Sequence, residues 1–302
     1  MLYSLKYYMK PITIISAPSV YGLKPTGVEH APAALRSAGL LERLSAEDGG
    51  IVYPSSPYNA VRDPDTLMLN TSAVRSYSND LAIPIASALE KNKFPLVLGG
   101  DCSIVLGALH ALREQSAIGL LYIDGHADFY HAEASPTGEV ADMVLQVASG
   151  RSPELFPETS REHPLIPEQR TVLFGYRDAA QARADGSADV RETAMDVYAL
   201  TSLREQGILE SAEKALRFLD TNGAKGYWIH FDVDVLEDSL MPAVDYRLPD
   251  GLLFEEASEA LRTFLHKGNA LGMDITIFNP ALDPEKKYAS SLVDLLERAF
   301  KP

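Results

Sequence analysis

Short, continuously apolar runs rich in β-branched and aromatic residues recur along the chain, separated by stretches that contain polar residues. Runs of this length and composition, bounded by Gly, Pro, Asn or Asp, are typical of buried β-strands. The pattern predicts about eight strands, at residues 12–16, 51–53, 95–98, 119–123, 171–174, 195–198, 227–231 and 270–275.

Between several of these runs, apolar residues recur at the spacing of a helix that buries one face. The alternation of strands and helices favours a largely parallel sheet with helices on both of its faces. Residues 150–169 are instead rich in Pro, Ser and Glu without a clear period, and we expect a long surface loop there. The predicted helices are 31–45, 73–91, 103–114, 202–218, 255–265 and 290–300.

The composition fits one domain that spans residues 1–302, because 46% hydrophobic and 23% charged residues are enough to bury one large core. The single cysteine, Cys102, cannot form an intramolecular disulfide, and Lys6 and Lys10 interrupt the region where a signal peptide needs an uncharged core. Both observations favour the cytoplasm. No run reaches the roughly 18 apolar residues of a membrane span, so we expect no membrane partner.

The formal net charge of -15 argues against a nucleic-acid partner, because binding to a phosphate backbone depends on clustered Lys and Arg. An excess of acid is also an ordinary means of keeping a protein in solution. The charge therefore points only weakly to a cationic ligand or a metal.

A predicted strand ends in Leu-Val-Leu-Gly-Gly-Asp-Cys-Ser, from Leu96 to Ser103. The two glycines and the acid stand just before a predicted helix, which Asp101 or Ser103 could cap. A turn of this kind is common in α/β proteins, so a purely structural role is as plausible as a functional one.

The strand at 119–123 leads into Asp124, His126 and Asp128, which alternate along the chain. In an extended segment, side chains two residues apart share one side and can converge on one point. Two carboxylates and an imidazole suit Mn²⁺, Fe²⁺ or Zn²⁺. The alternative is a cluster of caps and salt bridges, although unpaired charge is costly in a packed core.

Asp232 and Asp234 also lie two residues apart, where the strand at 227–231 ends. In open α/β sheets ligands bind at the carboxyl ends of the strands, where both acidic clusters fall. Carboxylates massed at one edge would repel each other unless cations lay among them. Two divalent ions would resolve the conflict.

A pair of divalent ions, typically about 3.5–4 Å apart, can lower the pKa of a shared water towards neutrality and provide a hydroxide nucleophile. Hydrolysis is the reaction class that follows. Competing signatures are missing from the sequence, which has no Gly-rich phosphate loop, no Gly-x-Ser-x-Gly and no Cys-x-x-Cys.

Together these segments resemble the ureohydrolase family, which includes arginase, agmatinase and formimidoylglutamase. The resemblance covers nearly the whole chain, since residues 22–40, with Gly-Val-Glu-His-Ala-Pro-Ala-Ala-Leu-Arg, look like the family's N-terminal segment. It implies a three-layer α/β/α fold with a central, mostly parallel sheet of eight strands. It also implies a homo-oligomer, trimeric or hexameric, that binds two Mn²⁺ ions and acts on a small-molecule substrate.

The resemblance further implies a role for each ligand-type residue. Asp124 and Asp232 would bridge the two metals, and Asp128 would complete one site. His126 and Asp234 would complete the other site. Asp128 would also accept a hydrogen bond from the bridging hydroxide that attacks the substrate, which makes it the catalytic candidate.

The chain departs from the family pattern at four positions. Cys102 stands where the family usually has a histidine ligand, and as a thiolate it would favour Zn²⁺ or Fe²⁺ over Mn²⁺; it could equally be a small buried residue that leaves one metal short of a ligand. Ala141 replaces the histidine that shuttles protons in arginase. Ile277 replaces the glutamate that grips the guanidinium, and Ala180 replaces the acid expected beyond residues 175–178.

Two loops provide candidate replacements for the lost contacts. Residues 241–252 resemble the family's Pro- and Gly-rich loop but insert Asp245, Tyr246 and Arg247, which form either a new specificity surface or a salt-bridged turn. The loop that follows Asp124, His126 and Asp128 contains candidate substrate-binding or acid–base side chains. These are Tyr130, His131, Glu139 and Asp142.

The leading hypothesis is a metal-dependent hydrolase that cleaves a C–N bond in a guanidine, amidine or amide other than free L-arginine. The rival is a catalytically silent relative that keeps its metals and serves as a binding or assembly subunit. The changes at Ala141 and Ile277 favour the rival. The retained acidic cluster opposes it, because buried acids are costly to keep without a use.

Overall fold

The computed structural model describes residues 10–113, 115 and 117–301, and its eight strands form one sheet in which every pairing is parallel. The spatial order is β2-β1-β3-β8-β7-β4-β5-β6. The prediction of a central parallel sheet with helices is confirmed. In chain order the strands are β1 (Ile12–Ala17), β2 (Glu47–Ile51), β3 (Phe94–Gly99), β4 (Ile118–Ile123), β5 (Thr171–Phe174), β6 (Asp196–Tyr198), β7 (Gly226–Asp232) and β8 (Ala270–Thr276).

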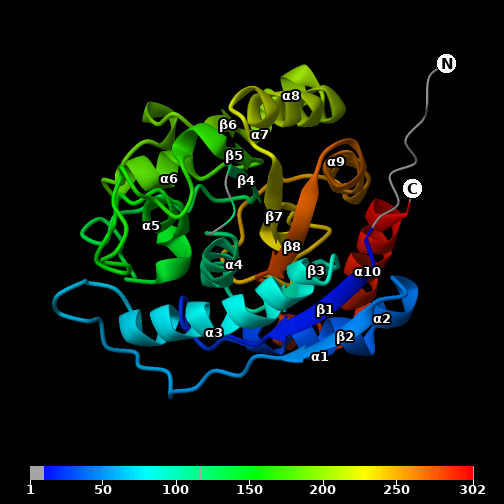
Figure 1. Cartoon of the computed structure of the whole chain (residues 1–302), viewed down its shortest axis with the longest axis horizontal. Helices are drawn as coiled ribbons and strands as arrows, with labels where there is room; N and C mark the ends of the chain where they lie inside the picture. The colour runs from blue at the N-terminus through cyan, green and yellow to red at the C-terminus, as the bar shows by residue number, and fades with distance from the viewer. Residues whose placement is uncertain (1–9, 114, 116, 302) are drawn as a thin grey trace.

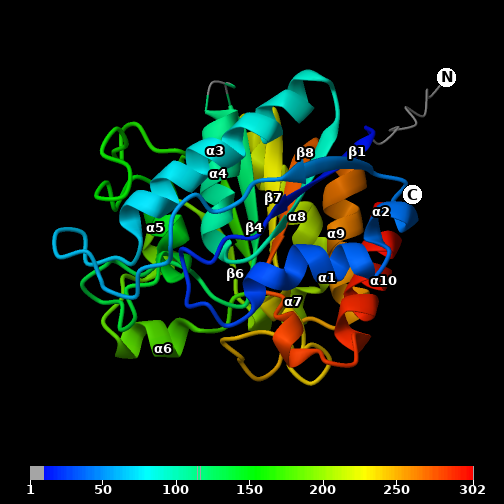
Figure 2. The ribbon, with the colours of Figure 1, turned by 90° about the horizontal axis from the view of Figure 1, so that it is seen from below.

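Helices cover both faces of the sheet, which Figure 2 shows between a layer with α3 and α4 and a layer with α1, α9 and α10. The first layer packs on β1, β3 and β7, and in the second α9 packs on both α8 and α10. The main helices are α1 (Ala31–Ser37), α2 (Leu40–Arg43), α3 (Thr71–Glu90), α4 (Val105–Leu112), α5 (Val144–Ala148), α6 (Ala179–Ala184), α7 (Leu200–Gln206), α8 (Ile208–Thr221), α9 (Phe254–Lys267) and α10 (Lys287–Phe300).

The central strands form because most of their residues are apolar on both sides, and every residue of β1, β3, β4 and β7 is buried. Helix α8 instead buries one stripe, in which Ile208, Ala212, Ala215 and Leu219 recur at helical spacing. Figure 1 shows β7 and β8 side by side in the middle of the molecule. The carboxyl ends of these central strands are where the candidate ligands lie.

Three local predictions need correction. The strand predicted at 51–53 lies at Glu47–Ile51, because this edge strand is mostly exposed and has no apolar pattern to reveal it. The single helices predicted at 31–45 and 202–218 are each interrupted where Gly39 and Gly207 adopt positive φ. Residues 150–169 are irregular, as predicted, but not merely superficial, since Phe156 is fully buried.

No helix within the described part of the chain is long and apolar enough to cross a membrane. Two positions used in the sequence-based predictions lie outside the described residues. They are Lys6, which argues against a signal peptide, and Glu114, the last residue of the helix predicted at 103–114.

Candidate metal centre

The candidate ligands lie at the carboxyl ends of three central strands, of which β7 and β4 are neighbours while β8 separates β3 from β7. Cys102 comes just after β3, Asp124 just after β4, and Asp232 is the last residue of β7. Asp101 caps the short 3-10 helix at Cys102–Ile104, since its side chain accepts a hydrogen bond from the backbone N–H of Ser103 at 2.9 Å. The predicted cap is thus confirmed, and it fixes the turn that places Cys102.

The first cluster, here called the Cys102 group, has one potential ligand atom from each of four buried residues, all within 4.8 Å of one another. The Cys102 thiol donates a hydrogen bond to Asp232 Oδ2 at 2.8 Å. Burial raises the pKa of this thiol well above its ordinary value, and the charge of Asp232 adds to the rise. The members of the group are Cys102, Asp124, His230 and Asp232.

The second cluster, here called the His126 group, consists of Asp124, His126 and Asp234. His126 Nδ1 lies 2.8 Å from Asp234 Oδ2 and 3.7 Å from Asp124 Oδ1. The backbone N–H of Gly125 donates to the other oxygen of Asp234 at 3.0 Å, which fixes that carboxylate. Asp124 belongs to both groups, so a carboxylate is placed between two potential metal positions.

Asp128 lies in neither group, although it borders the same cavity. The hydroxyl of Tyr122 donates a hydrogen bond to Asp128 Oδ2. Asp128 adopts a φ of 44°, which is uncommon for a residue other than glycine. The structure therefore brings together five of the six predicted ligands and holds the sixth beside them.

Burial, and after it the charge of neighbouring acids, opposes ionisation of most of these carboxyl groups. Burial raises the pKa of Asp124 to about 6, and the neighbouring Asp234 adds to the rise. Burial and nearby carboxylates also raise the pKa of Asp128 and Asp232 well above the ordinary value. On Asp234 burial acts in the same direction, but His126 outweighs it and lowers the pKa.

Two of the buried ligand atoms in the Cys102 group have no hydrogen-bond partner among the described residues. They are Asp124 Oδ2 and His230 Nε2, and they face each other at 3.9 Å. An unpaired buried polar atom is costly, and a divalent cation between the two would satisfy both and reduce the repulsion among the acids. The residues present therefore fit a metal centre.

Comparison with known proteins agrees with this geometry. The family model described as "Arginase family" matches residues 10–300. The chain belongs to the arginase family. This confirms the resemblance to ureohydrolases, and it makes the protein a metal-dependent hydrolase that acts on C–N bonds of guanidino or amidino groups, from a family of binuclear metal enzymes.

Individual relatives match over nearly their whole length. The arginase of Staphylococcus aureus (strain COL) is 28% identical over 299 residues, which is 96% of this chain and 97% of that protein. A structure of arginase from Bacillus caldovelox aligns with a TM-score of 0.84 at 27% identity and covers 97% of this chain and 99% of its own. Formimidoylglutamase from Bacillus subtilis, with a TM-score of 0.74 at 21% identity, shows the shared fold.

A cavity of about 390 Å³ opens above the metal centre of this arginase-family chain. Cys102, His126, Asp128, Asp232 and Asp234 reach its floor. The walls contain three of the four predicted substrate-binding or acid–base residues and the two apolar replacements, together with further polar side chains. These wall residues include Tyr130, Glu139, Asp142, Ala141, Ile277, Asp178, Gln181, Asp185, Asp245, Tyr246 and Arg247.

The predicted substrate-binding side chains already have partners within the chain. Tyr130 donates its hydroxyl hydrogen to Asp185 Oδ2 at 2.9 Å. Glu139 is only 2% exposed, accepts from the Tyr246 hydroxyl at 2.7 Å and lies 3.4 Å from Lys24 Nζ. That they contact substrate stays a prediction, and His131 does not border this cavity.

The buried carboxyl group of Asp142 in the cavity wall should make the stability of the folded chain depend on pH. Its Oδ2 accepts from Ser135 Oγ at 3.0 Å, whereas its Oδ1 is buried without a partner among the described residues. Burial raises its pKa to about 7. Between roughly pH 4 and pH 7 the folded chain therefore holds a proton that the unfolded chain has lost, so stability falls as pH rises through this window.

We expect Asp142→Asn to be more stable than wild type at pH 8, by on the order of 1 kcal/mol or more, because the neutral amide does not ionise. The difference should vanish near pH 4. Urea unfolding at pH 4, 6 and 8 measures it, with exposed Asp65→Asn as the matched control. A stability difference that does not depend on pH would contradict the prediction.

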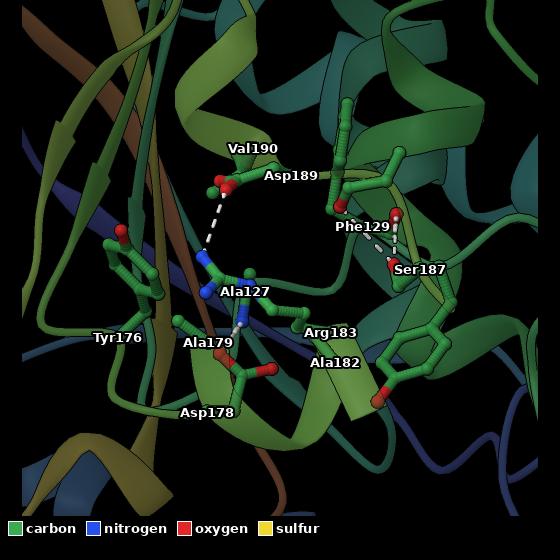
Figure 3. A pocket seen from close by; sticks show the side chains of 12 residues that line it. Ala127, Phe129, Tyr176, Asp178, Ala179, Ala182, Arg183, Ser187, Asp189 and Val190 are labelled. Carbon is green, nitrogen blue, oxygen red and sulfur yellow. Dashed lines mark hydrogen bonds and ion pairs between the residues drawn. The ribbon is translucent and has the colours of Figure 1, made fainter. Parts of the chain in front are cut away.

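A second, smaller cavity of about 40 Å³ is lined by Ala127 and Phe129, which lie in the same loop as His126 and Asp128 (Figure 3). Asp178 Oδ1 accepts from the backbone N–H of Ala127 at 3.1 Å, and Ser187 Oγ donates to the carbonyl of Phe129 at 3.2 Å. The space suits only a few waters. We infer that these contacts fix the loop behind His126, and that the substrate space is the larger cavity.

Three residues of the centre, His230, Tyr122 and Asp274, were not predicted from the sequence. The signal for His230 was present, because it lies two residues before Asp232 and so shares its side of the strand. Asp274 and Tyr122 gave no such signal. They become neighbours of His230 only through the strand register, which pairs Tyr122 with His230 and His230 with Asp274.

Proposed function

We propose that this chain is a two-metal hydrolase of a small guanidine, amidine or amide other than free L-arginine. The observation on which the proposal rests is the pair of ligand groups that share Asp124 and open into one cavity. Asp124 and Asp232 would hold both metals, Asp128 would hold the first, and His126 with Asp234 would hold the second. Residues 1–302 would act as one domain.

When bound, a pair of divalent ions supplies a water nucleophile near neutral pH and polarises the substrate. The chain's own contribution is to position a proton acceptor. Asp128 is fixed by the Tyr122 hydroxyl and borders the cavity, so it can take the proton of the attacking water. As the new C–O bond forms and the C–N bond breaks, Asp128 can return this proton to the leaving nitrogen.

The cavity wall argues against arginine as substrate. Ile277 is buried and borders the cavity where a guanidinium-binding acid is expected, and an alkyl side chain cannot pair with that cation. Ala180 is exposed on α6 and does not border the cavity. Gln181 and Asp185 of the same segment do border it, so we propose that they contact the distal end of the substrate.

The inserted residues of the loop at 241–252 form a fixed rim of the cavity. This rim would be both the salt-bridged turn and the specificity surface that the sequence left as alternatives. Arg247 pairs with Asp238 through contacts of 2.6 and 2.9 Å, and Asp245 Oδ1 accepts from Asn279 Nδ2 at 2.6 Å. Asp245, Tyr246 and Arg247 nevertheless all border the cavity. A rim that is already held in place can select substrates by shape without first becoming ordered.

The nature of the metal, the compartment and the assembly belong to the same proposal. Family membership favours Mn²⁺, whereas Cys102 bound as a thiolate would favour Zn²⁺ or Fe²⁺. We propose a cytoplasmic homo-oligomer, trimeric or hexameric, without nucleic-acid or membrane partners. Reconstitution of the metal-stripped protein with each ion, followed by elemental analysis, distinguishes the metals.

A substrate screen tests the proposed reaction. We expect the metal-loaded protein to release urea or ammonia from at least one guanidine, amidine or amide with a kcat/KM at least about 100-fold above that for L-arginine, because discrimination by an unpaired polar anchor is of this order or larger. Arginine as the best substrate would overturn the assigned specificity. A protein that binds two metals but cleaves none of the compounds would support the silent subunit instead.

A further inference from the structure

His230 lies in β7 between two residues that the strand register places beside it, Tyr122 of β4 and Asp274 of β8. Its ring stacks on that of Tyr122 with centroids 4.1 Å apart and planes 17° apart. The side chain is fully buried. Packing alone therefore restricts the plane of the imidazole ring.

The hydrogen bonds of His230 determine which nitrogen faces the metal centre. Nδ1 lies 2.5 Å from Asp274 Oδ1, and the other oxygen of Asp274 accepts from Trp228 Nε1 at 2.5 Å. With the Asp274 oxygen as the acceptor of this contact, Nδ1 is the donor and the lone pair lies on Nε2. This arrangement of carboxylate and imidazole is the usual support of a metal-binding histidine.

The free nitrogen points to the metal centre. Nε2 is buried without a hydrogen-bond partner among the described residues, and it lies 3.9 Å from Asp124 Oδ2, which also has none. Two donors that each lie about 2.1 Å from one ion can be up to about 4.2 Å apart. The observed separation is therefore compatible with an ion bound to both atoms.

We propose that His230 Nε2 is a ligand of the metal in the Cys102 group and that Asp274 is its positioning residue. The inference rests on the proposed two-metal function and adds a nitrogen ligand to it. The chain has Cys102 where the family pattern has a histidine, and His230 provides an imidazole to the same group from a different strand. The centre would then combine two imidazoles, one for each metal.

Cobalt titration of the metal-stripped protein tests the proposal without any assay of activity. His230→Asn keeps an amide that can donate to Asp274 but removes Nε2. We expect wild type to bind two Co²⁺ ions per chain, and His230→Asn to lose affinity for one of them by at least about 100-fold. Asp274→Asn should weaken the same ion by about 10- to 100-fold, as expected for a residue that supports a ligand.

His110→Asn is the matched control, because His110 also has a buried Nε2 without a hydrogen-bond partner among the described residues but packs on Phe156, outside both ligand groups. It should bind both ions as wild type does. NMR of the Co²⁺-loaded protein adds a second readout, namely the hyperfine-shifted N–H protons of ligating imidazoles. We expect two such signals in wild type and one in His230→Asn.

The outcomes separate the two proposals. If wild type binds two ions and His230→Asn binds both with unchanged affinity, His230 is not a ligand while the two-metal function stands. If wild type binds no ion, the two-metal function fails and the inference fails with it. Circular dichroism of the metal-stripped variants verifies folding, and a folded His230→Asn that binds one ion supports the proposal.

Discussion

Replacing Asp232 with asparagine is expected to reduce the metal content of the purified chain from about two ions to one or fewer and to lower kcat/KM by at least about 1000-fold. Asp232 Oδ2 accepts from Cys102 within the Cys102 group, and Oδ1 accepts from the backbone N–H of Asp234 at 2.8 Å. Asparagine can keep the second bond. It cannot provide two anionic oxygens to metals on both sides.

The thermal stability of metal-free Asp232→Asn shows whether a lower metal content reflects a lost ligand or a disrupted fold. Burial and the charges of Asp234 and Asp124 raise the pKa of Asp232, so its ionisation destabilises the folded state at pH values above the ordinary carboxyl range. Metal-free Asp232→Asn should therefore unfold at a temperature equal to or above that of metal-free wild type at pH 8.

Elemental analysis after gel filtration measures the metal content, with Asp196→Asn as a matched control on edge strand β6. Asp196 accepts from the hydroxyl of Tyr198 and belongs to neither ligand group, so its replacement should leave both metals bound. Two tightly bound ions in Asp232→Asn would refute the bridging role.

The sequence was most informative where the fold buries whole segments. Strand β5 lies at Thr171–Phe174, as predicted, because both of its faces are covered and no polar residue interrupts the apolar run. Strand β2 has only one neighbour and is mostly exposed, so Glu47–Ile51 contains acids and glycines that no burial pattern identifies. Edge strands of this kind are specified by their pairing with a neighbour rather than by local composition.

In the candidate metal centre, too, some residues could be predicted from the sequence and others could not. Asp124, His126 and Asp128 were found because they alternate along one segment, a pattern that predicts a shared side; the structure groups the first two and leaves Asp128 beside them. His230 was overlooked because a lone histidine in an apolar run is as readily a core residue as a ligand. Its partner Asp274 comes from a strand more than forty residues further along, and only the tertiary structure reveals that this acid orients the ring.

Asp128→Asn is the second change with a large expected effect. We expect kcat to fall by about 10²- to 10⁴-fold, the usual contribution of a group that transfers protons, with a much smaller change in KM. The amide keeps the size of the carboxylate but cannot accept the proton of the attacking water. Stopped assays on the best substrate of the screen measure the loss.

A graded series distinguishes proton transfer by Asp128 from loss of a ligand. The His126 group does not include Asp128, so Asp128→Asn should keep at least the metal bound there. Tyr122→Phe removes the hydroxyl that holds Asp128 Oδ2 and leaves the carboxylate in place, so its kcat should fall by a smaller factor, about 10-fold. If Asp128→Asn kept both metals and a kcat within about 10-fold of wild type, the proton would have to be transferred by another group, and the acids of the cavity wall, Glu139 and Asp142, would be the next candidates.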